Sequence, residues 1–293
     1  MSELILQISL NGLLLAMLYV LVALGLTLLF SIMNILNFAH AEMLMLAAFI
    51  SYYVIERFPM AQSGLANFAF AVILGILLVG AVGIILERIF FRPLRGRVLE
   101  MLIMSVGLGV AIQCGGYIAF GIMDKSVSIN IPGSLTISQA TLPATRVLII
   151  IASAILVSML FYIVHRTKLG MAMRAIEQDS ETAVMLGIRI NHVNLFAFVI
   201  ACALAGAAGV LISLVFVVNP VMGSEFLLKA FVVIILGGAG GIIGCVAGSL
   251  LLGFADSITG TLFGAHIAYG IGFALIIIVL LVKPTGLVGH AQK

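Results

Sequence analysis

The segment NFAHAE at 37–42 places strongly polar side chains between two apolar runs. Polar groups inside a membrane are costly and usually face a cavity or another protein surface. If the flanking runs lie in a bilayer, Asn37, Phe38, His40 and Glu42 are candidates for lining a transport pathway. The alternative is an ordinary polar turn at the membrane edge, and the chemistry of these residues alone leaves both open.

A second candidate is the glycine-rich segment GGAGG at 237–241, which interrupts a long apolar run. A straight helix tolerates glycine poorly, at about 1 kcal/mol per residue relative to alanine, so we expect the helix to break there. Small residues continue at four-residue spacing, which also allows close helix packing. A helix break and close packing both require residues without side chains, so both interpretations stay open. The glycines concerned are Gly237, Gly238, Gly240 and Gly241, followed by Gly244 and Gly248.

The stretch from 165 to 192, HRTKLGMAMRAIEQDSETAVMLGIRINH, is too long and too regularly patterned for a simple turn. It predicts an amphipathic helix that ends at Gly187, because a helix C-terminus favours a left-handed residue. Such a helix either lies on the membrane interface or docks into a groove of a soluble partner. Its predicted apolar stripe is Met171, Ala175, Ala183 and Leu186, with Glu177, Asp179 and Glu181 on the other side.

Signals for catalysis or cofactor binding are weak or missing. The sequence has no G-x-x-x-x-G-K-[ST] motif, so the chain cannot bind ATP through a P-loop of its own. Its five histidines are dispersed without metal-ligand spacing, and its three cysteines lie far apart in apolar runs, as packing residues do. Asp256 and His266 are expected near helix ends, in solvated or snorkelled positions. We therefore predict no catalytic residue, no metal site and no cofactor on this chain.

The elements that position these candidates must be membrane-spanning helices. Of the 293 residues, 63% are hydrophobic and only 9% are charged, with a mean hydropathy of +1.34. A water-soluble domain carries about 25% charged residues, so most of this surface must face lipid. The net charge of +3 is small and is not clustered with aromatic residues, which argues against nucleic-acid binding. Apolar runs fall near 10–33, 41–55, 65–86, 98–121, 147–164, 193–217, 226–255 and 265–282.

These runs predict an all-α membrane protein, a polytopic helical bundle of about eight hydrophobic segments that forms one domain over residues 1–293. Two of the segments are expected to be interrupted or re-entrant near the membrane midplane. The chain begins without a basic segment or a cleavage site, so we expect no cleaved signal peptide.

The charged connections predict the topology. Because cytoplasmic loops are enriched in Lys and Arg, the connections 87–97 and 165–192 should be cytoplasmic. The connection 122–145 is then external, with a short strand as a further expectation, and the N-terminus is external too. The C-terminus is cytoplasmic only if the run 226–255 dips to mid-membrane at its glycines and returns. A second interruption follows the run 10–33, and such a pair is the best pointer to a transport pathway.

Four stretches carry a family resemblance: ALGLTLLFSIMNILNFAHAEMLMLAAF (23–49), ERIFFRPLRGR (87–97), GMAMRAIEQDSETAVMLGIRINHVNLFAFVIACALAGAAGVL (170–211) and ILGGAGGIIGCVAGSLLLGFAD (235–256). Together they resemble the LivH-type permeases of bacterial branched-chain amino-acid ABC transporters, and the likeness runs over nearly the whole chain. One departure is Ala41, where family members commonly show glycine.

The resemblance implies the permease subunit of an ATP-driven importer in the bacterial inner membrane, with leucine, isoleucine and valine as substrates. The implied partners are a second related permease, two cytoplasmic ATPase subunits that use the ATP, and an external substrate-binding protein. The resemblance also makes the loop from Arg174 to Gly187 the segment that receives the motion of the ATPases. Glu177, Asp179 and Glu181 lie within this loop.

Alternatives stay open at this point. Similar permeases serve urea, amides or aromatic acids. An ion-driven secondary amino-acid transporter would need a carboxylate within the membrane, for which Glu42 is the candidate. An intramembrane enzyme lacks support, because the sequence has neither a G-x-S-G motif with a distant histidine nor paired aspartates within spans.

Overall fold

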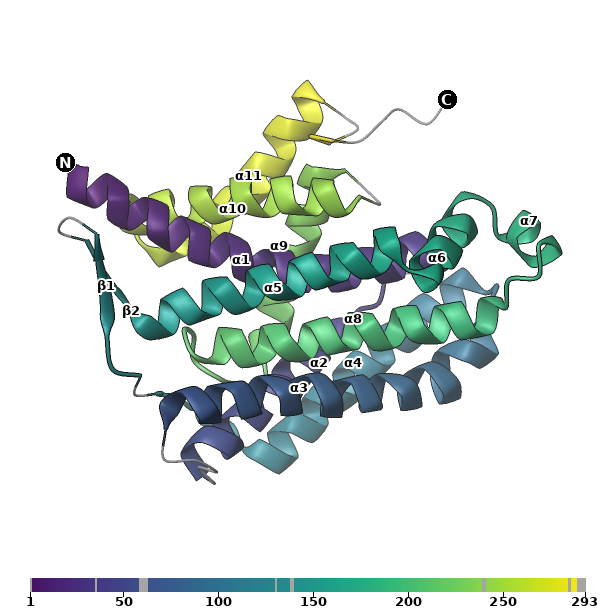
Figure 1. Cartoon of the computed structure of the whole chain (residues 1–293), viewed down its shortest axis with the longest axis horizontal. Coiled ribbons are helices and arrows are strands. Elements are labelled where there is room, and N and C mark those ends of the chain that lie inside the picture. Colours follow the sequence, from purple (N-terminus) through teal and green to yellow (C-terminus); the bar gives the residue numbers. More distant parts are fainter. Residues whose placement is uncertain are drawn as a thin grey trace.

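The computed structural model describes residues 2–34, 36–57, 63–129, 131–137, 140–238, 241–283 and 286–288. Over these ranges the chain is a bundle of helices, most of which run along its longest axis (Figure 1). In chain order the elements are α1 (Ser2–Met33), α2 (His40–Tyr52), η1 (Tyr53–Arg57), α3 (Gly64–Leu86), η2 (Glu87–Phe91), η3 (Arg92–Leu94), α4 (Val98–Phe120), β1 (Ser134–Ile137), β2 (Ala140–Pro143), α5 (Ala144–Arg166), α6 (Lys168–Gln178), α7 (Ser180–Met185), α8 (Ile190–Ser213), α9 (Met222–Gly237), α10 (Ile242–Phe263) and α11 (Ala265–Val282).

The predicted all-α polytopic bundle is confirmed. Within the described ranges, six helices are long and apolar enough to cross a membrane, namely Glu3–Met33, Gly64–Leu94, Val98–Phe120, Ala144–Arg166, Ile190–Ser213 and Ile242–Phe263. The predicted segment 41–55 forms the shorter helix α2 with 13 residues, and the first part of the predicted segment 226–255 forms α9 with 16 residues. Both fall below the length of about 20 residues that a span needs.

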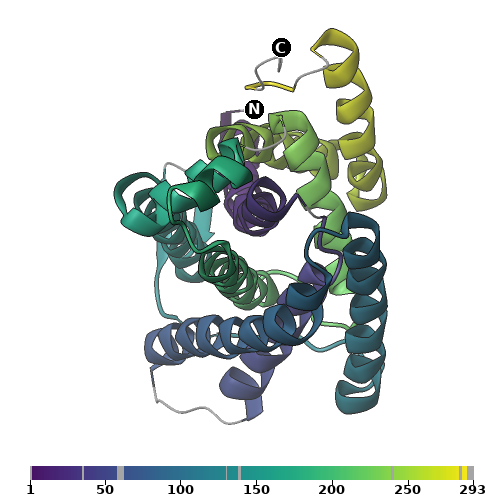
Figure 2. The ribbon, with the colours of Figure 1, turned by 90° about the vertical axis from the view of Figure 1, so that its right-hand side faces the viewer.

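The helix α1 lies inside the bundle, where Figure 2 shows it enclosed by other helices. Its middle turns are fully buried, with Leu18 and Leu21 both at 0% exposure. The helix α10 packs along it without a spacer, because a Cβ at Gly253 would come within 2.5 Å of the backbone nitrogen of Ala16. Small residues at such contacts let membrane helices approach closely, in the absence of a hydrophobic driving force.

A second set of contacts is built on α8, which packs against α2 and α3. A Cβ at Gly206 would lie 2.5 Å from the carbonyl oxygen of Gly75 on α3. A Cβ at Gly209 would lie 2.2 Å from the carbonyl oxygen of Leu44 on α2. Glycine is therefore required on this face of α8 for the three helices to touch.

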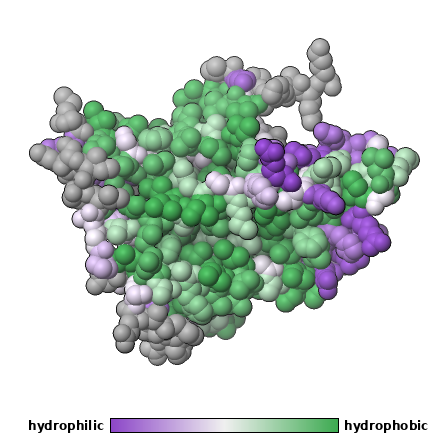
Figure 3. All heavy atoms as spheres, in the orientation of Figure 1, coloured by the Kyte–Doolittle hydropathy of each residue, from purple (hydrophilic) through white to green (hydrophobic). Residues whose placement is uncertain are grey.

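The surface of the bundle exposes many large hydrophobic side chains, among them Ile118 at 88% exposure and Leu281 at 81% exposure. The face drawn in Figure 3 is apolar over most of its length. A soluble monomer rarely exposes large contiguous apolar patches. This surface is suited to lipid or to another membrane subunit. Hydrophilic side chains gather at the end where α6 and α7 lie (Figure 3).

The opposite end carries the β-hairpin of β1 and β2 (Figure 1). The two strands pair antiparallel, with Ser134 opposite Pro143, so the connection 122–145 holds strand structure as expected. The first turns of α1 lie at this same end, where Arg146 Nη1 donates a hydrogen bond to Asn11 Oδ1 at 2.8 Å. The predicted topology requires the N-terminus and the connection 122–145 to share one end, and they do.

The two basic connections, 87–97 and 165–192, meet at the other end. The side chain of Arg95 donates a hydrogen bond to Asn191, at the start of α8. Their common location at one end agrees with the predicted topology. That this end is the cytoplasmic one stays a prediction.

The run 226–255 reverses direction at its glycines. The helices α9 and α10 pack antiparallel, because a Cβ at Gly244 would meet Gly237 and a Cβ at Gly248 would meet Val233. The segment Gly286–Val288 returns to this reversal, with the Leu287 N–H donating to the Leu236 carbonyl at 2.8 Å. The predicted interruption is therefore present, and the depth of the reversal in a membrane stays a prediction.

Candidate functional site

The chain between α1 and α2 turns back around Asn37, which is 2% exposed. The Asn37 Oδ1 accepts a hydrogen bond from the Ala39 N–H at 3.1 Å, and its carbonyl accepts one from the His40 N–H at 3.2 Å. An Asn side chain that bonds the backbone two residues on is an Asx turn, and here it starts α2. The polar segment is thus a buried part of the bundle.

His40 and Glu42 lie inside the bundle, at 0% and 5% exposure. The imidazole of His40 lies against α1 at Gly25, where a Cβ would come within 2.8 Å of its Cε1. Within the described part of the chain, the Oε2 of Glu42 has no hydrogen-bond partner, and the His40 ring lies beside the backbone of Val22 on α1. Buried polar atoms without partners are uncommon and call for a water, an ion or another binding partner. The cavities described below are lined by other residues.

The first break is held in place by α4 and α9. The ring centroid of Phe38 lies 5.5 Å from that of Phe231 on α9, and the Phe38 N–H donates to Ser105 Oγ on α4 at 3.3 Å. The first turn of α9 touches α2, because a Cβ at Gly223 would come within 2.4 Å of the carbonyl oxygen of Ala41. Phe38 is therefore a packing contact to α9 in this structure.

The second break lies at the far end of α9. Gly237 ends the helix, and Gly238 has a φ of 94°, a conformation that favours glycine. A Cβ at Gly237 would lie 2.2 Å from the carbonyl oxygen of Gly244. Gly241 precedes α10 in extended conformation, while Gly240 lies outside the described residues. The two predicted pathway groups are joined by α9, which contacts the first break and ends at the second.

The predicted coupling helix is two helices, α6 and α7, that meet at Asp179. Asp179 is extended, with φ −158° and ψ 107°, and its Oδ1 accepts hydrogen bonds from the N–H groups of Glu181 at 2.9 Å and Thr182 at 3.1 Å. This is an N-cap, for which Asp is a preferred residue. The hydroxyl and N–H of Thr182 also hold the pKa of Asp179 below its usual range. A new helix therefore starts at this residue.

The predicted apolar stripe is wrong at both of its ends. Met171 is 63% exposed and Leu186 is 76% exposed. The side chains that pack inward are Met173 and Ile176 on α6 and Ala183 on α7. The stripe assumed a single helical period across 165–192, and the cap at the α6–α7 junction resets that period.

Gly187 has the predicted left-handed conformation, with φ 83°. Its N–H donates to the Val184 carbonyl at 2.9 Å, and the Ile188 N–H donates to the Ala183 carbonyl at 3.1 Å. This pair of bonds is a Schellman motif, which satisfies the last carbonyls of a helix. Of the other predicted coupling residues, Glu177, Asp179 and Glu181 are exposed and Arg174 is half-buried.

The loop forms one wall of an open groove of about 680 Å³ at the charged end of the bundle. The end of α1, the connection before α4 and the start of α8 form the other walls. The charged residues that line this groove are Arg95, Glu177, Asp179 and Glu181. The structure therefore brings three of the predicted coupling residues to one concave surface. We call this surface the coupling groove.

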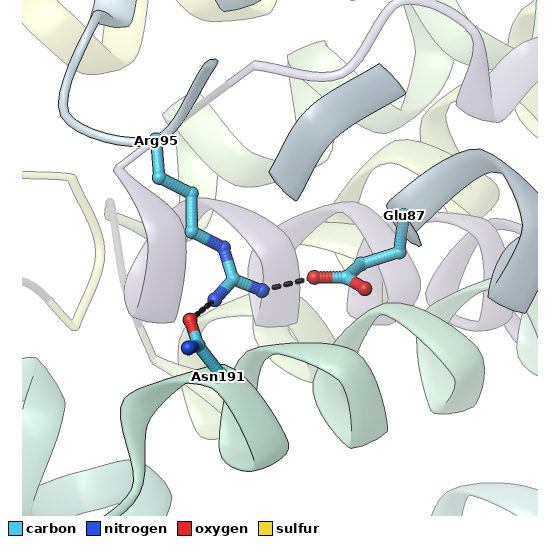
Figure 4. A network of polar contacts seen from close by, with 3 residues as sticks. All are labelled: Glu87, Arg95 and Asn191. Atoms are coloured by element: carbon cyan, nitrogen blue, oxygen red, sulfur yellow. Dashed lines mark hydrogen bonds and ion pairs between the residues drawn. The ribbon is translucent and has the colours of Figure 1, made fainter. Parts of the chain in front are cut away.

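A polar network fixes one side of the coupling groove (Figure 4). The guanidinium of Arg95 donates to the Glu87 carboxylate and to the Asn191 side-chain oxygen. Glu87 is 1% exposed, so this ion pair is largely removed from water. Burial lowers the pKa of Arg95 and the adjacent Glu87 charge raises it, and an arginine stays protonated in any case. The network ties η2 to the first turn of α8.

One group of buried polar side chains was missed by reasoning from the sequence. Asp256 is 6% exposed, and its Oδ2 accepts hydrogen bonds from Lys229 Nζ at 2.7 Å and Tyr19 Oη at 2.8 Å. The expectation that Asp256 is solvated at a helix end is wrong. The helix α10 continues to Phe263, and the hydrogen-bond partners of Asp256 come from α1 and α9. The available signal was Lys229 within the apolar run 226–255 and Asp256 directly after it, because charges within membrane segments often mark functional positions.

No metal site can be built from the residues that the structure describes, since no three His, Cys, Asp or Glu side chains are grouped closely enough. The cysteines are free thiols, with Cys202 and Cys245 buried and Cys114 exposed. Cys245 lies 2.8 Å from Thr27 Oγ1, between α10 and α1.

Comparison with known proteins identifies the family. The family described as "Branched-chain amino acid transport system / permease component" matches residues 8–282. The branched-chain amino-acid permease protein BraD of Pseudomonas aeruginosa is 32% identical, over 98% of this chain and 96% of the relative. The permease protein LivH of Escherichia coli is 31% identical over the same shares, and a probable LivH of Methanocaldococcus jannaschii is 26% identical over 94% of this chain and 90% of the relative. This chain belongs to the family of branched-chain amino-acid transport permease components.

Proposed function

We propose that this chain is the membrane-spanning subunit of an ATP-driven importer for leucine, isoleucine and valine. The observation that carries the proposal is the match over residues 8–282, together with relatives that are 31–32% identical over nearly their full length and are named for branched-chain amino-acid transport. A multi-pass bundle with a charged groove at one end suits a subunit that receives work from a soluble partner.

The partners in this proposal are a second related permease, two ATPase subunits and an external substrate-binding protein. The sequence has no P-loop, so the ATP is bound and hydrolysed by the ATPase subunits. The coupling groove is the proposed docking surface, with Glu177, Asp179 and Glu181 available to basic side chains and Gly187 setting the end of α7. Arg174 is half-buried and lines a separate small pocket with Ser31 and Ile32 at the end of α1.

The two breaks supply the proposed pathway. Asn37, Phe38, His40 and Glu42 lie on the first, and the glycines from Gly237 to Gly241 lie on the second. Burial of His40 and Glu42 inside the bundle supports this role, because such groups need a polar partner that a pathway would supply. In the proposed orientation in the bacterial inner membrane, the hairpin end is external and the coupling groove is cytoplasmic.

The orientation is tested by labelling single cysteines in a background without the native three. A cysteine at Ser134 should react with a membrane-impermeant reagent from outside, and one at Asp179 only from inside. The reverse pattern would invert the proposed orientation.

The function is tested with the cognate external protein and the reconstituted transporter. Binding of leucine, isoleucine and valine by that protein, and their ATP-dependent uptake into proteoliposomes, are expected. Binding of urea, an amide or an aromatic acid instead would change the assigned substrate and leave the assigned transporter class unchanged. Uptake driven by an ion gradient without ATP would replace the class with a secondary transporter.

A further inference from the structure

A pocket of about 180 Å³ lies against the buried Lys229–Asp256 pair, between α1, α9, α10 and α11. Its lining combines apolar side chains, among them Leu15, Phe216 and Phe226, with three charged ones. An apolar cavity of about 150 Å³ in another protein is large enough to bind benzene. The pocket therefore has room for a small organic group with an apolar body.

Asp256 is incompletely paired. Its Oδ2 accepts hydrogen bonds from both Lys229 and Tyr19, whereas its Oδ1 is buried and has no hydrogen-bond partner within the described ranges. An ionised carboxylate only accepts hydrogen bonds, and a buried acceptor left without a donor is costly. Asp256 lines the pocket, so a cation bound there would lie beside its carboxylate, while Oδ1 itself is covered by protein.

The charges of the pocket favour a cationic group. Asp256 and Glu225 each carry one negative charge and Lys229 carries one positive charge, so the lining has a net charge of 1 − 2 = −1. Glu225 is exposed at the mouth. Ionisable side chains on membrane helices face a protein interior or a water-filled cavity rather than lipid. The mouth of the pocket must therefore open to water or to a neighbouring subunit.

We propose that this pocket binds the transported amino acid, with the ammonium group of the substrate beside the carboxylate of Asp256. The aliphatic side chain of the substrate then packs against Leu15, Phe216 and Phe226. Lys229 and Tyr19 are positioning residues, because both donate hydrogen bonds to Oδ2 of Asp256. This inference rests on the proposed function, which supplies an α-amino acid as the substrate, and it adds the residues that contact that substrate.

Photolabelling of the wild-type transporter provides the direct test. The assembled complex is irradiated with L-photo-leucine, in which a diazirine lies in the side chain, and the labelled peptides are located by mass spectrometry. Label is expected on α1 near Leu15 and on α9 near Phe226. Excess isopentylamine, which keeps the ammonium, should reduce the label, and 4-methylpentanoate, which has only the carboxylate, should not. Label confined to other parts of the chain, or competition by the acid alone, would overturn the proposal.

Substitutions separate a binding role from a structural one. Asp256→Asn should reduce both pocket labelling and leucine uptake by about tenfold or more, since a hydrogen bond to a charged group is stronger than one between neutral groups. That variant leaves Lys229 buried without its counter-charge, which can disturb folding. The double variant Lys229→Gln/Asp256→Asn removes both charges, and it should co-purify with its partners while staying unlabelled. Normal labelling and uptake by the double variant would show that the pair is only structural.

A matched control and a separate readout keep the two proposals apart. Glu100→Gln removes a carboxylate from an exposed ion pair with Arg97 on α4, and it should leave labelling and uptake unchanged. If the proposed function is wrong, the wild-type transporter takes up no leucine at all. If only the pocket is wrong, wild-type uptake is normal and photo-leucine labels another part of the chain.

Discussion

Replacing Gly187 by valine should disable the coupling loop while leaving the membrane helices in place. Gly187 has φ 83°, in the left-handed region, and a β-branched residue is a genuine outlier there. The same turn holds the two closing bonds of α7, from Gly187 to Val184 and from Ile188 to Ala183. The valine must therefore either adopt a strained backbone or give up both bonds.

The magnitude follows from the backbone alone. No atom lies within 4 Å of a Cβ built on Gly187, so the substitution introduces no clash. A left-handed residue other than glycine costs about 1–2 kcal/mol, and about 1.4 kcal/mol corresponds to a tenfold change in population. The helix α7 has only 6 residues, too few to be stable by itself. We expect coupled uptake to fall by about tenfold.

The assay is leucine uptake and ATP hydrolysis by the reconstituted transporter, with and without the liganded binding protein. Gly121→Val is the matched control, because Gly121 has φ 82° with nothing within 4 Å of its Cβ and lies at the hairpin end. Its ψ is −179°, a region that is essentially restricted to glycine, so this variant has at least the same backbone cost and should leave coupling intact. Equal losses in both variants would refute the argument, as would normal coupling in both Gly187→Val and the charge reversal Glu177→Lys.

Three further predictions concern the other contacts around the coupling groove and the second break. Arg95→Met leaves its buried carboxylate partner unpaired and should lower the free energy of unfolding by about 3–5 kcal/mol, measured as a lower thermal midpoint of the purified chain. Arg97→Met breaks an exposed ion pair and should lower it by at most about 1 kcal/mol. Equal losses in the two variants would contradict this prediction. Hydrogen bonding lowers the folded-state pKa of Asp179, so its carboxylate should keep capping α7 from pH 8 down to about 4 and lose the cap below that pH. Hydrogen exchange at the start of α7 measures the cap. Loss of the cap near neutral pH would show that the Asp179 carboxylate is not what holds the start of α7. Gly237→Ala should separate α9 from α10 at a cost of about 1–3 kcal/mol, whereas Gly241→Ala, whose Cβ would meet its nearest neighbour at 3.7 Å, should be tolerated; similar thermal midpoints would show that close packing at Gly237 is unimportant.

Features that depend on local chemistry could be predicted from the sequence. The glycines from 237 onward and the polar residues at 37–42 mark real helix breaks, because a helix cannot easily continue through either. Gly187 was placed correctly since one left-handed residue closes a helix by bonds to its own last turn. Basic residues placed two connections at one end, because that rule counts charges and needs no knowledge of packing.

Features that depend on distant partners could not be predicted. Asp256 is bonded to residues 27 and 237 positions away in the sequence, and no spacing rule joins Lys229 or Tyr19 to it. The split of the coupling loop is a different case, because Asp179 followed by Thr182 has the composition of a helix start. Looking for N-cap residues before assigning an apolar stripe would have separated α6 from α7.

The position of α1 links the proposed substrate pocket to the coupling groove. Tyr19 lies near its middle and lines the charged pocket, while Ile32 near its end lines the groove. Between them the helix is unbroken and buried, with no proline, no glycine pair and no π-bulge at which a helix bends. Close-packed interiors transmit displacement rather than absorb it. A displacement of α1 at the coupling groove therefore meets no bend in the helix before Tyr19. Through the hydrogen bond from Tyr19, the displacement would also move the carboxylate of Asp256.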